Sequence, residues 1–279
     1  MKSQVWLITG CSTGLGKSFA QNALKAGHHV VATARNLQSL DYLENSDRLL
    51  KSVLDVNNSQ HIAHVIQLTL EKFGKIDVLV NNAGYGLEGA FEELKMEEIR
   101  KQMDTNFFGL VELTQAVLPI MRNQKNGYIF NISSIAGKRG IAGMSIYNAS
   151  KFAVTGLSEA LAQELEPFGI KVVAVAPGPY RTDWAGRSLA KSENLKTLNP
   201  QSPYFELNQK VYTFMSQADG NQPGNPDQIA SILLCASQKE KLPVHMIFGE
   251  PAIEVWNRKL EKYQSPDFIQ FFPHEQYEF

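Results

Sequence analysis

The 279-residue sequence is poor in cysteine, carries no excess of either charge and has no long apolar segment. Its two cysteines, Cys11 and Cys235, lie far apart and form no CxxC pair, so we expect reduced thiols and no metal site. A formal net charge of −1 argues against a nucleic-acid partner and against binding to an anionic membrane. Because no apolar run reaches the roughly 18 residues of a membrane-spanning helix, we expect no membrane partner and a cytoplasmic protein.

Short apolar runs alternate with amphipathic stretches along most of the chain. The period of the apolar residues switches repeatedly between that of a strand and that of a helix. This alternation predicts an α/β fold with a doubly wound parallel sheet, a Rossmann fold with three α/β/α layers. The expected strands are 5–9, 30–34, 52–56, 78–80, 128–132, 171–176 and 244–248, and the expected helices are 14–26, 59–73, 110–121, 145–168, 226–236 and 253–263.

Residues 177–226 have a different composition, in which Pro, Asn and Ser mix with aromatic residues. We interpret this segment as a lid or loop in the substrate region. Residues 249–279 are expected to form a C-terminal extension, a helix followed by an irregular aromatic tail. No repeat, low-complexity tract or linker divides the sequence, so a single domain is expected to cover residues 1–279.

Three glycines follow the first expected strand, where the chain reads Thr9-Gly10-Cys11-Ser12-Thr13-Gly14-Leu15-Gly16. Glycines let the backbone turn tightly and approach a diphosphate, which the free N–H groups and the dipole of the next helix attract. Glycine also serves tight turns for steric reasons alone. The G-x-x-x-G-x-G spacing departs from the common G-x-G-x-x-G pattern, so the turn by itself is a weak indication of a dinucleotide site.

Four further motifs follow the turn in a fixed order. They are Asn81-Asn82-Ala83-Gly84, Ser133-Ser134, Tyr147-Asn148-Ala149-Ser150-Lys151, and Pro177-Gly178 with Thr182; Asn106 lies between the first two. Together with the glycine turn they closely resemble the short-chain dehydrogenase/reductase family, over about residues 5–248. The resemblance implies a nicotinamide dinucleotide cofactor and hydride transfer between a carbonyl and an alcohol. The segment 181–188 and the helical extension are similar to the 17β-hydroxysteroid and retinol dehydrogenase-like branch, an analogy at the level of fold.

Tyr147 and Lys151 stand four residues apart on an expected helix, so their side chains share one face. A nearby ammonium group favours a phenolate and lowers the pKa of a tyrosine, which makes Tyr147 a candidate general acid and base. Ser134 could hydrogen-bond the substrate oxygen as charge develops there, whereas we expect Ser133 to bond the backbone. Taken singly, each residue is more often structural, but their joint occurrence in family order favours catalysis.

The resemblance adds further roles. It implies that Lys151, beside Tyr147, also holds the nicotinamide ribose hydroxyls, and that the backbone carbonyl of Asn106 holds a water connecting Lys151 to solvent. It places Asp55 and Val56 at the adenine amino group, although Asp55 could equally cap a turn. The other cofactor contacts that it implies are Asn82, Ala83 and Gly84 beside the adenine ribose, and Pro177, Gly178, Tyr180 and Thr182 around the nicotinamide carboxamide and the diphosphate.

The segment Thr33-Ala34-Arg35-Asn36 bears on the choice of cofactor. Ala34 occupies the position where NAD enzymes place an acidic residue for the ribose 2′-hydroxyl, and Arg35 could contact a 2′-phosphate with two parallel hydrogen bonds. We therefore expect NADP(H) in preference to NAD(H). The alternative is that Arg35 is only a solvated loop charge.

The expected partner is a small, mostly apolar carbonyl or alcohol, since the residues near Tyr147 and after the Pro-Gly pair are largely apolar. Alternatives are an in-class 3-ketoacyl reductase, a catalytically idle dinucleotide sensor and a sugar-nucleotide epimerase. The resemblance also implies a homodimer or homotetramer. The candidate pocket walls are Ile141, Met144, Trp184, Tyr204, Phe205, Tyr212 and Phe214.

Overall fold

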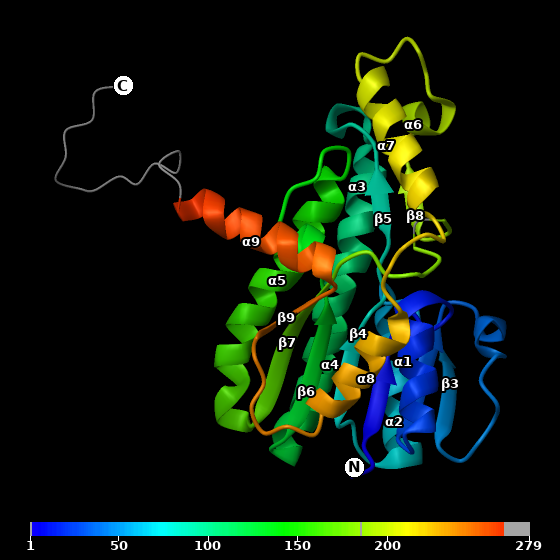
Figure 1. Cartoon of the computed structure of the whole chain (residues 1–279). Helices are drawn as coiled ribbons and strands as arrows, with labels where there is room; N and C mark the ends of the chain where they lie inside the picture. Colours follow the sequence, from blue (N-terminus) through cyan, green and yellow to red (C-terminus); the bar gives the residue numbers. More distant parts are fainter. Residues whose placement is uncertain (1, 185, 265–279) are drawn as a thin grey trace.

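Seven parallel strands form the centre of the molecule (Figure 1). The structure, a computed structural model, describes residues 2–184 and 186–264. The strands pair in the order β3-β2-β1-β4-β6-β7-β9, all in parallel. The residues of these strands are almost all apolar because helices cover both faces of the sheet. The strands are β1 (Val5–Ile8), β2 (His29–Ala34), β3 (Leu49–Val53), β4 (Val78–Asn81), β6 (Gly127–Ile132), β7 (Ile170–Pro177) and β9 (His245–Phe248).

Two layers of helices cover the sheet and form two separate apolar cores. Helices α1 (Gly14–Lys25) and α8 (Pro226–Ala236) pack on one face, where Phe19 and Trp6 belong to the same core. Helices α2 (Ser59–Phe73), α4 (Gly109–Gln124) and α5 (Ser145–Leu165) pack on the other. The predicted α/β/α Rossmann fold is therefore confirmed.

Local sequence determines where several of these helices begin and end. The Asn58 side chain accepts hydrogen bonds from the backbone N–H groups of Gln60 and His61, which caps the start of α2. Gly74, with a φ of 72°, ends the same helix in the left-handed conformation. Asn225 caps α8, and Pro226 occupies its first position, where its missing N–H costs no hydrogen bond.

The strand order reverses between β1 and β4, which places a crevice at the carboxyl ends of these two strands. The glycine turn follows β1 and the Asn81–Gly84 motif follows β4. The fold therefore brings two of the motifs together at the position where open α/β sheets bind their ligands.

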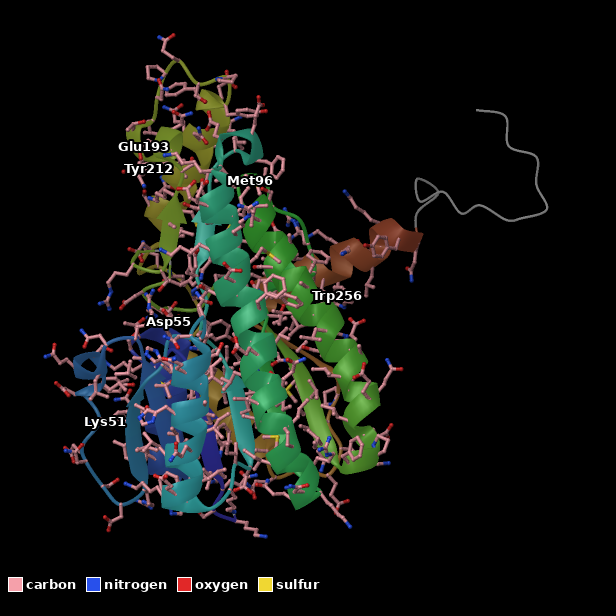
Figure 2. The ribbon with its side chains drawn as sticks, turned by 180° about the vertical axis from the view of Figure 1, so that it is seen from behind. Lys51, Asp55, Met96, Glu193, Tyr212 and Trp256 are labelled. Atoms are coloured by element: carbon pink, nitrogen blue, oxygen red, sulfur yellow. The ribbon has the colours of Figure 1, made fainter. Side chains whose placement is uncertain are left out.

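Above the carboxyl edge of the sheet stands a second group of elements (Figure 1). Strands β5 (Gly86–Glu88) and β8 (Leu189–Lys191) form a two-stranded parallel sheet there, next to α3 (Met96–Met103), α6 (Glu193–Thr197) and α7 (Phe205–Ala218). In the view of Figure 2, Asp55 lies below this group, which carries Glu193 and Tyr212. Helix α9 (Glu250–Gln264) projects to one side and carries Trp256.

The shorter turns of helix lie mostly between these elements. They are the 3-10 turns Leu37–Leu40, Phe91–Glu93, Ile135–Gly137 and Glu166–Phe168, and the π-helical turn Asp104–Phe108 between α3 and α4. In the part of the chain that the structure describes, no helix is long and apolar enough to span a membrane.

Three expectations about the elements differ from the structure. The lid segment is not merely loop, because it contains β8, α6 and α7, and helix α3 was not expected. The third strand is Leu49–Val53 rather than 52–56, since Leu54 and Val56 are buried in the turn after it and only resemble a continuing strand. Residues 265–279 of the expected C-terminal extension lie outside the described residues.

Candidate active site

The glycine turn between β1 and α1 has a backbone that only glycine adopts without strain. Gly10 and Gly14 have φ angles of 69° and 57°, in the left-handed region. A Cβ at Gly16 would lie only 2.3 Å from the carbonyl oxygen of Gly10. The Thr13 side chain makes no capping hydrogen bond at the start of α1, so the first N–H groups of the helix remain available to a ligand.

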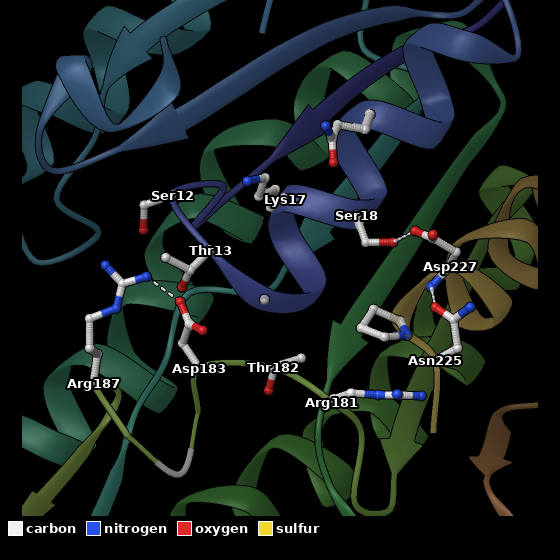
Figure 3. Close-up of a pocket in the computed structure, with 13 residues that line it drawn as sticks. Ser12, Thr13, Lys17, Ser18, Arg181, Thr182, Asp183, Arg187, Asn225 and Asp227 are labelled. Atoms are coloured by element: carbon white, nitrogen blue, oxygen red, sulfur yellow. Dashed lines mark hydrogen bonds and ion pairs between the residues drawn. The ribbon is translucent and has the colours of Figure 1, made fainter. Parts of the chain in front are cut away.

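A cleft of about 290 Å³ opens at the start of α1 (Figure 3). Thr182 lies across the cleft from the glycine turn, where a Cβ at Gly14 would come within 3.3 Å of its side chain. Two segments that the sequence assigned to the cofactor therefore meet here. Because N–H groups and the positive end of the α1 dipole face it, the cleft favours an anionic group such as a diphosphate. The charged residues that line the cleft are Lys17, Arg181, Asp183, Arg187 and Asp227, and Arg187 forms an ion pair with Asp183.

Asn82 ties the end of β4 to the glycine turn. Its Nδ2 donates to the carbonyl oxygens of Thr9 at 2.8 Å and of Gly10 at 3.1 Å. The backbone N–H groups of Asn82 and Ala83 both donate to Thr9 Oγ1 at 2.9 Å. These bonds hold the two sides of the crevice at a fixed separation.

Arg35 stands exposed directly after β2, next to the buried Ala34. Its charge acts on Tyr85, which follows Gly84. Burial raises the pKa of the Tyr85 hydroxyl above its ordinary value, nearby carboxylates act in the same direction, and Arg35 opposes them. Arg35 therefore lies within electrostatic reach of the β4 side of the crevice.

Asp55 and Val56 lie just after β3. One carboxylate oxygen of Asp55 accepts a hydrogen bond from the backbone N–H of Asn57 at 3.0 Å, and the Asp55 backbone N–H donates to His61 Nδ1 at 3.2 Å. Asp55 thus has the turn-capping role that the sequence left open. Its adenine contact remains a prediction.

Tyr147 and Lys151 lie side by side on α5 and are both buried. The Lys151 Nζ is 5.8 Å from the centre of the Tyr147 ring and donates to the carbonyl oxygen of Ile132 at 2.7 Å. Burial lowers the pKa of Lys151 to about 8. Burial also raises the pKa of Tyr147 to about 12, although a hydrogen bond with Ser134 opposes the rise. The lowered tyrosine pKa expected from the sequence is not found, because desolvation by burial outweighs the interaction with Ser134 in the protein alone.

The two serines after β6 have different partners. Ser134 contacts the Tyr147 side chain and also accepts a hydrogen bond from the backbone N–H of Ala136 at 3.1 Å. Ser133 donates to the backbone carbonyl of Lys151 at 3.0 Å and shares a hydrogen bond with Thr155. Ser133 is thus a structural tie to α5, as the sequence led us to expect.

Asn148 positions the same loop, a role that sequence reasoning missed. Its Nδ2 donates to the carbonyl oxygens of Ala136 and Arg139, both at 2.8 Å, and its Oδ1 accepts from the backbone N–H of Ile141 at 3.0 Å. One amide thus holds the segment after Ser134 against α5. The sequence offered one signal for this role, an amide residue immediately after Tyr147 and therefore on another face of the helix.

Asn106 lies in the π-helical turn between α3 and α4. Its side chain accepts from the backbone N–H of Tyr85 at 2.9 Å and donates to the carbonyl oxygen of Tyr85 at 2.9 Å and to Ser150 Oγ at 3.1 Å. A Cβ on Gly84 would lie 3.1 Å from Asn106 Oδ1 and 3.6 Å from Lys151 Nζ. Gly84 therefore lies next to both Asn106 and Lys151, and a side chain there would press on the Asn106 amide. Single π-helical turns inside helices occur frequently at functional sites.

The Pro177–Thr182 segment leaves β7 beside this site. The Gly178 N–H donates to the carbonyl oxygen of Phe248 at 2.9 Å, and a Cβ there would be 3.0 Å from that of Ala252. Tyr180 is buried and pairs through its backbone with Gly224. These contacts fix the start of the segment and leave Thr182 at the cleft.

The apolar side chains around Tyr147 only partly match the candidate pocket walls. Trp184 stacks at a tilt on Tyr147, with ring centres 5.2 Å apart, and Ile141 and Met144 pack in the same cluster. Helix α7 contributes Met215, whereas Phe214 is 67% exposed. Tyr204 donates a hydrogen bond to Glu92, and Tyr212 lies under Lys191. The periodicity of α7 was not recognised, so its inward residue was not identified.

In the described ranges 2–184 and 186–264, no group of three or more His, Cys, Asp or Glu side chains is arranged to hold a metal ion. The site contains instead a crevice at the carboxyl ends of β1 and β4, together with the buried Tyr147 and Lys151 and the half-buried Ser134. The short chain dehydrogenase family model matches residues 4–193, and this chain belongs to that family.

Two named relatives align with this chain, one over nearly its whole length and the other over about two thirds of it. Oxidoreductase BOA17 of Botryotinia fuckeliana is 36% identical over 268 residues, covering 95% of this chain and 96% of that protein. The 3-ketodihydrosphingosine reductase of Bacteroides thetaiotaomicron is 47% identical over 182 residues, covering 65% and 66%. These relatives confirm an oxidoreductase of the carbonyl/alcohol class and do not single out the hydroxysteroid and retinol branch.

Solved structures agree with the fold. A short-chain dehydrogenase from Streptomyces avermitilis has a TM-score of 0.84 at 37% identity, with 94% of this chain and 95% of that chain covered. ElxO with NADP bound has a TM-score of 0.73 at 27% identity, covering 90% and 99%. A 3-ketoacyl-(acyl-carrier-protein) reductase from Brucella melitensis in complex with NADH has a TM-score of 0.72 at 26% identity, covering 88% and 95%. The cofactor is therefore a nicotinamide dinucleotide, and the relatives do not distinguish NADP(H) from NAD(H).

Proposed function

We propose that this protein is an NADP(H)-dependent oxidoreductase that interconverts a ketone or aldehyde and an alcohol on a small, mostly apolar substrate. Tyr147 serves as the general acid and base. The observation that carries the proposal is the burial of Tyr147 and Lys151 side by side, with Ser134 next to the Tyr147 hydroxyl. Few structural roles favour a phenol, an ammonium and a hydroxyl grouped in one dry site.

The bound cofactor supplies or accepts the hydride. During reduction, the Tyr147 hydroxyl donates its proton to the carbonyl oxygen, and Ser134 stabilises the charge that develops on that oxygen. Lys151, whose pKa is lowered to about 8 by burial, stays largely protonated at neutral pH and stabilises the resulting phenolate. A proton then returns to Tyr147 from solvent through Lys151 and a water that the backbone carbonyl of Asn106 would hold.

We assign the dinucleotide to the crevice above β1 and β4. The diphosphate lies at the glycine turn, the ribose hydroxyls contact Tyr147 and Lys151, and Thr182 closes the cleft. Arg35, with no carboxylate at Ala34, favours a 2′-phosphate and hence NADP(H). The remaining adenosine contacts assigned here are Asp55, Val56, Asn82, Ala83 and Gly84, and Pro177, Gly178 and Tyr180 support the nicotinamide side.

We assign the substrate to the apolar cluster of Met144, Trp184 and Met215 next to Tyr147. Apolar burial supplies most of the affinity in such sites. The 3-ketodihydrosphingosine reductase among the relatives supports a ketone on an aliphatic chain. A 3-ketoacyl reductase is the in-class alternative, supported by the Brucella melitensis structure. The similarity of segment 181–188 to the hydroxysteroid and retinol dehydrogenase-like branch is an analogy at the level of fold and does not identify the substrate.

An idle dinucleotide sensor is the alternative outside enzymes. It predicts binding of the cofactor without turnover. A cytoplasmic location and a homodimer or homotetramer formed through α4 and α5 remain predictions from the sequence.

The test follows oxidation of NADPH and NADH over aliphatic, aromatic, quinone and steroid carbonyls. The proposal predicts turnover with NADPH preferred for at least one class. Binding of NADPH with no turnover of any carbonyl would favour the sensor, and a preference for NADH would show that Arg35 has no role in cofactor choice.

A further inference from the structure

Glu88, at the end of β5, has a carboxyl group that the site described above does not use. Its side chain is fully buried, and neither carboxyl oxygen has a hydrogen-bond partner among the described residues. Burial raises the pKa of this carboxyl to about 7, and Lys191 acts in the opposite direction. Burying a polar group without a partner costs folding free energy. A compensating interaction with a ligand would account for its presence.

The register of the two-stranded sheet shows which way Glu88 faces. Gly86 pairs with Leu189 and Glu88 with Lys191, so these four residues share one face of the β5–β8 sheet. Leu189 on that face packs in the cluster with Tyr147. A Cβ on Gly86 would meet the Trp184 ring at 2.8 Å. The face that carries Glu88 is therefore the face turned toward the catalytic tyrosine.

The segment before α5 joins Glu88 to the same site. The backbone N–H of Gly89 donates to the carbonyl oxygen of Gly143 at 2.9 Å, next to Met144 of the Tyr147 cluster. The hydroxyl of Ser145, two residues before Tyr147, also lacks a partner in the part of the chain described. Each of the two segments that this backbone hydrogen bond joins therefore carries a polar side chain without a hydrogen-bond partner.

The one cation paired with Glu88 in the ladder does not neutralise it. Lys191 makes no ion pair with Glu88 within 4.0 Å among the described residues, and its Nζ lies 4.6 Å from the centre of the Tyr212 ring on α7. The Glu88 carboxyl therefore remains an acceptor without a hydrogen-bond or ion-pair partner among the described residues.

We propose that Glu88 is a specificity-determining residue, which binds a hydroxyl or ammonium group carried on the same molecule as the reacting carbonyl. The inference rests on the proposed carbonyl reduction and narrows its substrate to an amphiphilic hydroxy or amino ketone, or the corresponding alcohol. A site built to bond a polar group discriminates strongly against analogues that lack it, because its own buried group is then left unpaired.

The experiment compares kcat/KM with NADPH for a straight-chain methyl ketone and for its hydroxy and amino analogues, with the substituent moved one carbon at a time. Wild type should prefer at least one analogue to the parent ketone by about tenfold or more. Glu88→Leu should abolish that preference while the parent ketone is turned over at a similar or higher rate. Glu88→Gln, close in shape, should keep part of the hydroxyl preference and lose the ammonium preference. Glu97→Leu, an exposed glutamate on α3, is the matched control and should change nothing.

Two results would overturn the inference. The first is that wild type has the same kcat/KM for the analogues as for the parent ketone. The second is that a Glu88→Leu variant, shown to be folded by circular dichroism, has a kcat/KM lowered by the same factor for all substrates. Turnover of the parent ketone tests the proposed function separately. If no ketone reacts, calorimetric binding of the same analogues to the NADPH complexes of wild type and Glu88→Leu decides the question, because a donor-dependent loss of affinity does not need turnover.

Discussion

Burial governs the ionisation of the residues proposed to be catalytic. Tyr147 and Lys151 were identified from sequence because their spacing on a helix and their order among the motifs are local properties. The directions in which their pKa values shift were not predictable, because desolvation depends on how the whole fold buries these side chains. The same limit applies to Glu88, which reads in the sequence as an ordinary surface glutamate.

Lys151 should make stability depend on pH in the alkaline range. Its folded pKa of about 8 lies below the ordinary 10.5, so between these values the unfolded chain binds more protons and the free energy of unfolding rises with pH. Below about pH 8 the burial penalty is fully present, on the order of 3 kcal/mol. The free energy of unfolding of wild type minus that of Lys151→Met should therefore increase from pH 8 to pH 10.5 in denaturant titrations. A difference that is flat or falls with pH would show that Lys151 is not desolvated.

Arg35 should determine cofactor choice. Arg35→Ala removes the guanidinium from the position of the 2′-phosphate, and loss of a charge-assisted bidentate contact costs about 2 kcal/mol or more. We expect KM for NADPH to rise by roughly tenfold to a hundredfold while KM for NADH changes little. Arg122→Ala, on α4 away from the crevice, serves as control. Equal losses with both cofactors would mean that Arg35 supports the fold instead.

At the scale of elements, the most predictable part of the fold is the strand, turn and helix around Gly10–Gly16. Each of its determinants is local: apolar strand residues, glycines in the turn and an amphipathic helix. The small elements above the sheet could not be predicted in this way, since β5 and β8 are three residues each. Their pairing joins segments about a hundred residues apart, and only the tertiary fold brings Gly86 against Leu189.

Gly16→Ala should show what the glycine turn alone contributes to cofactor binding. The new Cβ would lie 2.3 Å from the Gly10 carbonyl oxygen and 2.5 Å from Asn82 Nδ2, so the turn must shift and break the contacts that Asn82 makes. Affinity for NADPH should fall by at least tenfold in fluorescence titrations. Gly156→Ala, where a Cβ meets open space on α5, is the matched control. Unchanged NADPH affinity in Gly16→Ala would remove the glycine turn from the cofactor site.

At the scale of the whole molecule, the crevice joins parts of the fold that are distant in sequence. The glycine turn, the segment after β4, α5 and the Thr182 segment all border it. The fold class followed from the sequence because alternating strands and helices imply a parallel sheet, whereas the position of the crevice became apparent only from the strand order. The packing of α7 and Trp184 over Tyr147 did not follow from the sequence either, because it depends on contacts between the upper elements.

A ligand that binds across these segments should stabilise the whole domain. With NADPH at about a hundredfold its Kd, linkage gives about 2.7 kcal/mol, which corresponds to a rise in Tm of about 5–10 °C for a chain of this size. Differential scanning fluorimetry with and without NADPH measures it, and adenosine serves as a control that lacks the diphosphate. A Tm that does not respond to saturating NADPH would contradict the dinucleotide crevice.

The central claim is that the chain transfers hydride from NADPH to a carbonyl with Tyr147 as the proton donor. The most direct measurement is mass spectrometry of the alcohol formed from a methyl ketone and NADPH deuterated at the transferring position, with wild type and with Tyr147→Phe. We expect one deuterium in the wild-type product and a rate at least a hundredfold lower for Tyr147→Phe, with NADPH binding retained. Undeuterated product, or a Tyr147→Phe variant as fast as wild type, would contradict it.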